Sequence, residues 1–376
     1  MPSSREDIER KNRKPSCHCV QLVLVSSSEI SWLRGTCILR LFTHEGYFWA
    51  WWENNTISLS RIQVWCSRHN LEKTQTLDAL FSLPSFLSFL SFLFRRMNGA
   101  EKLILDFQNN FGGDIVDGYS FLAILFPDHP LRQFPTQFRA SKLIQQLVDA
   151  AAKLGGSEGR TINSNFYWET WAEPNGVPYN DSSGFFYPLV SKQFGGVSEE
   201  YSKPFSVNPD LVSVESLFES AAEAGADGVG GGFGLHKEPL FSQENILFVT
   251  NGLCVSVCAT VASYVEEMTN VTTVAVGGMM DLPMAIENTG GGQVESFGEL
   301  QRAISAFGLS ESPYAPAPFD WLKTNFRFTI RQDLSLEAPH TPLEFLFKPA
   351  HRRVMYTDAN VLNQHQLYLD VSALFG

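Results

Sequence analysis

The stretch that decides the fold runs from Ile246 to Val265 and reads Ile-Leu-Phe-Val-Thr-Asn-Gly-Leu-Cys-Val-Ser-Val-Cys-Ala-Thr-Val-Ala-Ser-Tyr-Val. An apolar run, a glycine, a small polar residue and a second apolar segment predict a strand, a tight turn and a helix. This arrangement lifts the Ser256 hydroxyl to the edge of a sheet, at a helix N-terminus that stabilises an oxyanion. It follows the logic of a nucleophile elbow, although the Gly-x-Ser-x-Gly spelling is absent. We therefore expect Ser256 to be an acyl-transfer nucleophile; the alternative is a serine that caps the helix.

A second stretch predicts another strand followed by a turn. Leu103 to Asp106 is a buried strand by its composition, and Gly112 and Gly113 follow in the next turn, before an apolar segment that opens at Ile115. Adjacent glycines allow a backbone to approach a ligand or to adopt positive φ. One turn would then offer a nucleophile and the other would offer N–H donors, although an ordinary βα turn also explains the glycines.

Together the two stretches resemble the C-terminal processing (tail-specific) serine peptidase family. That family carries a strand ending in Asp-x-Arg-x-Asn-x-Gly-Gly; here Asp106, Asn110 and the two glycines match, and Gln108 replaces the arginine. The Cys-x-Ser-x-Cys spelling around Ser256 is most similar to the fungal branch, which resembles chlamydial protease-like activity factor. The resemblance covers residues 78–358. It implies a crotonase/ClpP-like spiral α/β core over residues 76–376, after a divergent or truncated N-terminal region over residues 1–75.

The resemblance also implies the roles of the site residues. The backbone N–H groups of Gly113 and Val257 would form the oxyanion hole, with Gly112 beside them. Most members of the family use a lysine about 25 residues after the serine as the base, but Asp281 stands at that place here. The chlamydial-like branch uses a histidine with a glutamate instead, and His44 is our candidate for the base.

Two further observations concern the remaining members of the triad. His44 begins the run His-Glu-Gly-Tyr-Phe, which is similar to a His-Asp-Gly-His-Phe motif of the fungal branch. The acid of that branch follows the serine by roughly sixty residues, a spacing that Glu311 and Asp320 bracket. We take Glu311 as the candidate, while each of the two also fits an ordinary surface carboxylate.

Composition bounds the function further. The chain has 376 residues, 44% of them hydrophobic, and a net charge of −12, which disfavours nucleic acid and anionic membranes as partners. The apolar run from Phe81 to Phe94 is too short to span a bilayer. No metal-ligand set and no dinucleotide fingerprint occur, so we expect neither a metal nor another cofactor. Cys254 and Cys258 flank Ser256 and form either a disulfide or two packed thiols.

These observations predict a serine endopeptidase that acts on a peptide or protein substrate. The resemblance to the fungal branch also implies a role in trimming a precursor peptide in a ribosomal peptide toxin pathway. Two alternatives stay open: a catalytically inactive peptide-binding homologue that has lost its base, and a crotonase-like acyl-CoA enzyme. The polar N-terminus, which contains acidic residues, is no signal peptide, and the sequence does not specify a compartment.

Overall fold

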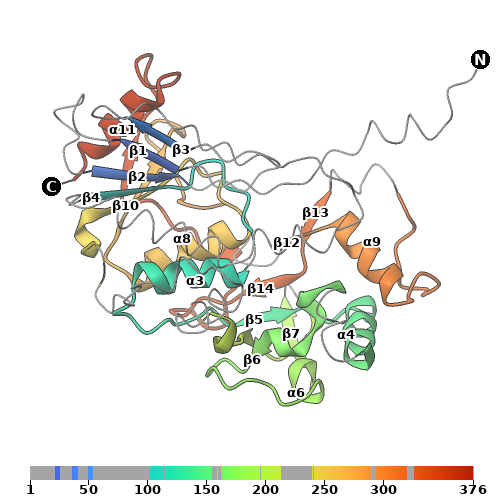
Figure 1. Cartoon of the computed structure of the whole chain (residues 1–376). Helices are drawn as coiled ribbons and strands as arrows, with labels where there is room; N and C mark the ends of the chain where they lie inside the picture. The colour runs from blue at the N-terminus through green and yellow to red at the C-terminus, as the bar shows by residue number, and fades with distance from the viewer. Residues whose placement is uncertain are drawn as a thin grey trace, which may run out of the picture.

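The computed structural model describes residues 22–25, 36–40, 50–53, 102–113, 115–154, 159, 162–194, 196–212, 239, 241–288, 294–319 and 326–375. Its central element is a seven-stranded sheet (Figure 1). All neighbouring strands in this sheet are parallel except β1 and β2, which are antiparallel. The strands lie in the order β15 (Arg352–Val354), β11 (Thr272–Val276), β10 (Ile246–Thr250), β4 (Lys102–Asp106), β2 (Thr36–Arg40), β1 (Leu22–Val25) and β3 (Ala50–Glu53).

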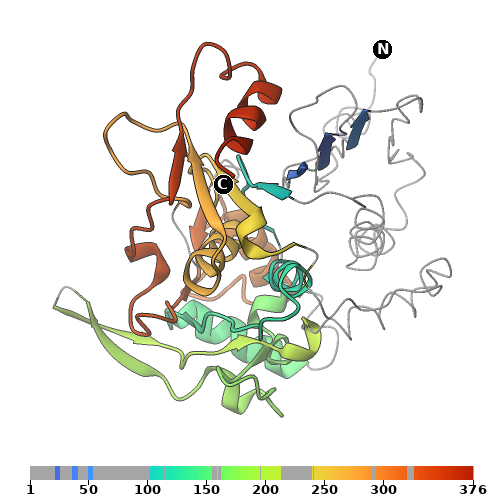
Figure 2. The same cartoon turned by 90° about the vertical axis from the view of Figure 1, so that its left-hand side faces the viewer.

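Helices cover both faces of this sheet (Figure 2). Helices α3 (Ile115–Leu125) and α8 (Val257–Met268) follow β4 and β10 and pack on one face. Helix α11 (Gln364–Ser372) packs on the other face. Alternate residues of each strand point to opposite faces, so Leu105 and Phe248 join the core under α3 and α8, whereas Ile104 and Leu247 meet α11. Burial on both faces explains why β4 and β10 are continuous apolar runs.

A second group of elements lies beside α3 and α8, on the side away from the sheet (Figure 1). Strand β14 (Arg331–Asp333) pairs with β5 (Thr136–Phe138), and β7 (Val190–Phe194) forms a hairpin with β8 (Val197–Tyr201). Buried aromatic rings hold these elements together; they include Phe138, Phe166, Trp171, Phe185 and Phe205. Many of the phenylalanines of the chain are thus core residues.

The remaining elements are short. They are β6 (Trp171–Ala172), β9 (Ser206–Val207), β12 (Val294–Ser296), β13 (Arg327–Thr329), α4 (Lys142–Leu154), α6 (Ser183–Phe186) and α9 (Phe297–Ala306), with 3-10 helices η1 (Ser164–Phe166), η2 (Trp168–Thr170), η3 (Pro209–Leu211), η4 (Gln243–Asn245) and η5 (Leu343–Phe345). Strands β6 and β9 form one antiparallel pair, and β12 and β13 form another. Among the described helices, none is long and apolar enough to cross a membrane.

The predicted α/β class is confirmed, and so are the strand–turn–helix units at β4–α3 and β10–α8. The finer expectation of a spiral, crotonase/ClpP-like core stays a prediction. The division into residues 1–75 and 76–376 also stays a prediction. The apolar run from Phe81 to Phe94 lies outside the described residues.

Candidate active site

Ser256 occupies a strained position between β10 and α8. It stands at the N-cap of α8 with φ 57° and ψ −130°. These angles are close to those of the first central residue of a type II′ turn, at about +60° and −120°. Positive φ is uncommon for residues other than glycine, and the surrounding structure must hold it in place. The turn therefore presents Ser256 in the manner of a nucleophile elbow.

The Ser256 side chain does not cap the helix. A capping serine accepts a hydrogen bond from the N–H of the second or third helical residue. Ser256 makes no such bond, and its hydroxyl has no hydrogen-bond partner among the described residues. The residue is 5% exposed. N-capping, the alternative explanation for a serine here, is therefore not how this hydroxyl is used.

The glycine turn after β4 is fixed by a buried carboxylate. Asp106 is fully buried; its Oδ1 accepts the Gln108 N–H at 2.9 Å, and its Oδ2 accepts the Tyr368 hydroxyl at 2.6 Å. Tyr368 belongs to α11, so a hydrogen bond from this helix fixes the C-terminal end of β4, where the turn begins. Asp106 thus shapes the turn.

The glycine turn and the serine turn lie against each other. Asn110 forms a parallel bridge with Cys254, in which its N–H donates to the Leu253 carbonyl at 2.9 Å and its carbonyl accepts the Val255 N–H at 3.1 Å. Beyond this bridge Gly112 has φ 91°, and a Cβ at residue 112 would lie 2.6 Å from the Ser256 Cβ. Only glycine fits at this contact.

The three residues predicted at the oxyanion hole differ in whether their N–H groups are available to a substrate. The Gly112 N–H donates to Asn110 Oδ1 at 2.8 Å, within its own turn. Gly113 is exposed beside it. Val257 is the first residue of α8, where N–H groups have no partner within the helix. Gly112 therefore contributes close packing, and Gly113 and Val257 remain the candidates for donors.

A disulfide brackets the serine. Cys254 and Cys258 are joined across a Cα–Cα distance of 5.1 Å, and both are buried. The choice between a disulfide and two thiols is thus resolved in favour of the disulfide. The Asn288 N–H donates to the Cys254 carbonyl at 2.9 Å, which ties the segment after β11 to the same turn.

The structure does not test the predicted base, and it shows no link between the predicted acid and this site. His44 and Asp320 lie outside the described residues. Glu311 is exposed in the turn after α9. Within the described part of the chain, no hydrogen bond or ion pair links Glu311 to the serine turn. Its role stays a prediction.

Three carboxylates with raised pKa values were not predicted from the sequence: Asp333 and Glu287 are buried, and Glu344 is partly buried. Asp333 Oδ2 accepts the hydroxyl of Thr260, which lies one turn beyond Ser256 on α8, at 2.9 Å. Burial raises the pKa of Asp333 to about 6, that of Glu344 to about 7 and that of Glu287 to about 8. Such shifts concentrate at functional sites. The sequence signal for Glu344 is a lone carboxylate in the apolar run from Leu343 to Phe347.

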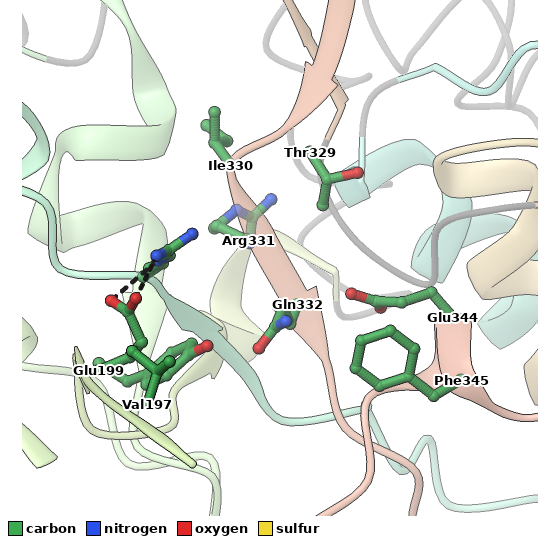
Figure 3. A pocket seen from close by; sticks show the side chains of 10 residues that line it. Val197, Glu199, Thr329, Ile330, Arg331, Gln332, Glu344 and Phe345 are labelled. Atoms are coloured by element: carbon green, nitrogen blue, oxygen red, sulfur yellow. Dashed lines mark hydrogen bonds and ion pairs between the residues drawn. The ribbon is translucent and has the colours of Figure 1, made fainter. Parts of the chain in front are cut away.

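Glu344 reaches into a pocket of about 420 Å³ between β8, β14 and η5 (Figure 3). The view shows its carboxylate between Thr329 and Phe345, on the side of the pocket opposite the Arg139–Glu199 ion pair. Its Oε2 is buried and has no hydrogen-bond partner among the described residues. Ser256 does not line the pocket. The described residues hold no cluster of His, Cys, Asp and Glu side chains that could bind a metal ion.

Comparison with known proteins finds similar fungal proteins. No family model matches the chain. It is 27% identical over 317 residues to the Peptidase S41 family protein ustP of Aspergillus flavus, covering 75% of this chain and 63% of that protein. It is 29% identical over 214 residues to the Peptidase S41 family protein phomP1 of Diaporthe leptostromiformis, covering 55% and 30%. The chain is thus similar to fungal proteins of the Peptidase S41 family.

The resemblance to tail-specific peptidases is thereby confirmed. The chain spans less than two thirds of the length of the curated proteins that it matches. Among solved structures it is similar to mature CPAF complexed with lactacystin, at 14% identity and a TM-score of 0.39, covering 77% of this chain and 46% of that one. A second structure of mature CPAF gives 15% identity, a TM-score of 0.36, and coverages of 72% and 42%.

Proposed function

We propose that this S41 relative is a serine endopeptidase with Ser256 as its nucleophile. The observation that carries the proposal is the contact between the two turns. The Ser256 hydroxyl has no hydrogen-bond partner among the described residues, and Ser256 lies on a strained backbone at a helix N-terminus, packed against Gly112, where no Cβ fits. This combination is costly to maintain for structure alone and is useful for attack on a carbonyl.

The proposed reaction has two halves. A base accepts the Ser256 proton as Oγ attacks the peptide carbonyl, and the N–H groups of Gly113 and Val257 bind the oxyanion. Collapse of the tetrahedral intermediate expels the amine, which takes the proton back from the base. Water then attacks the acyl-enzyme with the same base, releasing the acid product and restoring Ser256.

His44 is the proposed base, because a neutral imidazole has a pKa of about 6.5 and suits this task near neutral pH. Glu311, the candidate from the sequence, is the proposed acid that orients the His44 imidazole. We consider Glu344 as a second candidate, since its Oε2 is buried and has no hydrogen-bond partner among the described residues. Glu344 also interacts electrostatically with Asp333, which is bonded to the serine helix at Thr260.

The proposed substrate is a peptide, and the proposed role is the trimming of a precursor peptide in a fungal ribosomal peptide toxin pathway. Support comes from the curated relatives, which are fungal S41 peptidase family proteins.

The proposal is tested with a fluorophosphonate probe, which labels activated serines, and with hydrolysis of a peptide library. Wild type should react with the probe, and Ser256→Ala should neither react nor hydrolyse. His44→Ala should label more slowly by several orders of magnitude, because members of a triad act as a unit. Glu344→Gln and Glu311→Gln distinguish the two candidate acids.

Two outcomes would overturn the proposal. A wild type that neither labels nor cleaves any peptide would favour the non-catalytic peptide-binding protein. Activity that survives Ser256→Ala would favour crotonase-like chemistry, which does not need the serine.

A further inference from the structure

Asn109 and Asn251 join the glycine turn to the serine turn by side-chain hydrogen bonds, beyond the last regular pair of β4 and β10. We call this pair of residues the clasp. Asn251 Nδ2 donates to Asn109 Oδ1 at 2.9 Å, and the Asn109 N–H donates to Asn251 Oδ1 at 3.1 Å. The same Asn251 Oδ1 accepts the Leu253 N–H at 3.2 Å. The two residues are 142 positions apart in the chain.

The hydrogen bonds also determine how the Asn251 amide is oriented. Its oxygen accepts two backbone N–H groups, and a flipped amide would point its own NH₂ at both of them. In the observed orientation the NH₂ is left to face the Asn109 oxygen. All three interactions therefore support one another.

The clasp lies in a gap between two backbone pairings of the two turns. The last regular pair of β4 and β10 is Asp106 with Val249. The next pairing is the bridge between Asn110 and Cys254, and between the two pairings the chain after β10 has one more residue than the chain after β4. The clasp lies between these pairings and holds together two backbones that diverge there.

We infer that Asn109 and Asn251 are positioning residues of the peptidase, an inference that rests on the function proposed above. The hydrogen bonds described above join the two asparagines to each other and to Leu253, and none of them involves Ser256. By holding one turn against the other, they set the distance from Ser256 Oγ to the N–H group of Gly113, the proposed donor in the glycine turn. The bound geometry of an acyl-transfer site tolerates errors of only a fraction of an ångström.

The test uses Asn251→Ala with two comparisons. Asn251→Asp keeps an oxygen for the N–H groups of Asn109 and Leu253 and loses only the donor to Asn109 Oδ1. Asn175→Ala is the matched control, because Asn175 Oδ1 accepts the Val177 N–H at 3.1 Å in a similar exposed turn, in a different part of the chain. Each variant is compared with wild type for kcat and KM on a peptide and for the rate of fluorophosphonate labelling.

Asn251→Ala should lower kcat and the labelling rate about tenfold, the change that corresponds to ~1.4 kcal/mol. Its KM should stay within about twofold, because positioning acts on the transition state rather than on substrate binding. Asn251→Asp should recover most of the loss, and Asn175→Ala should match wild type. A labelling rate for Asn251→Ala equal to that of Asn175→Ala overturns the inference.

A second variant and a second readout separate this inference from the proposed function. Asn109 has φ 58°, so glycine fits there without strain and Asn109→Gly removes only the side chain. Hydrogen exchange in the segment 251–257 should be faster in Asn109→Gly than in wild type. If wild type proves inactive, the proposed function fails, and unchanged exchange in this variant would separately refute the clasp.

Discussion

The contact between Gly112 and Ser256 makes a quantitative prediction for Gly112→Ala. The new Cβ would lie 2.6 Å from the Ser256 Cβ, 2.7 Å from the Val255 carbonyl oxygen and 3.0 Å from the Val257 nitrogen. Ordinary contacts begin at 3.4 Å, so the two turns must separate by about 0.8 Å. A misplacement of about 1 Å costs a catalytic site roughly a hundredfold in rate. We therefore expect fluorophosphonate labelling of Ser256 to be slower by about two orders of magnitude.

The same substitution also strains the backbone, because Gly112 has φ 91° and positive φ costs an L-residue about 1–2 kcal/mol. Gly196→Ala isolates this cost: Gly196 has φ 83°, and no atom lies within 4 Å of its Cβ position. Both variants should lose stability in thermal unfolding, but only Gly112→Ala should lose labelling. A folded Gly112→Ala protein that labels within about threefold of wild type would refute the proposed packing of the two turns.

Two further predictions concern the surroundings of the serine. The double variant Cys254→Ala, Cys258→Ala should lower the free energy of unfolding, measured in urea, by about 2 kcal/mol, which is the value expected for a disulfide that closes so short a loop. A mass spectrum of the untreated wild-type protein that shows both of these cysteines as free thiols would contradict the disulfide. Burial raises the pKa of Glu287 from 4.5 to about 8, so the folded protein holds this proton more tightly than the unfolded chain does. Its contribution to stability is complete below about pH 4.5 and is lost as the pH rises towards 8, so Glu287→Gln should reduce the fall in unfolding free energy between pH 5 and pH 8. A wild-type protein that is equally stable at both values would show that Glu287 is not buried as described.

Local sequence signals were enough to predict the two halves of the candidate site. The apolar runs before Asp106 and Asn251, the glycine pair, and the apolar segment after Ser256 each depend on a few neighbouring residues, so their strands, turns and helix follow from period and composition. Gly112 could be singled out because positive φ and close approach both demand glycine.

The surroundings of these turns could not be predicted in the same way. The sequence does not single out Asp333, and only the pairing of β14 with β5 brings this carboxylate into the core, where it bonds Thr260 of α8. The clasp between Asn109 and Asn251 is equally invisible, because each asparagine alone reads as a turn residue. Burial and partnership of this kind arise from contacts between distant parts of the chain.

The 142 positions between Asn109 and Asn251 have a consequence for how the protein acquires its reactivity. Contacts of such long range form only after a large loop has closed, and they tend to form late in folding. The angles of Ser256 and the placement of Gly112 depend on each other across that loop. A chain that has not yet brought β4 and β10 together contains the serine but not the arrangement that activates it. If Ser256 is the nucleophile, as proposed above, the chain has no activated serine until its native topology has formed.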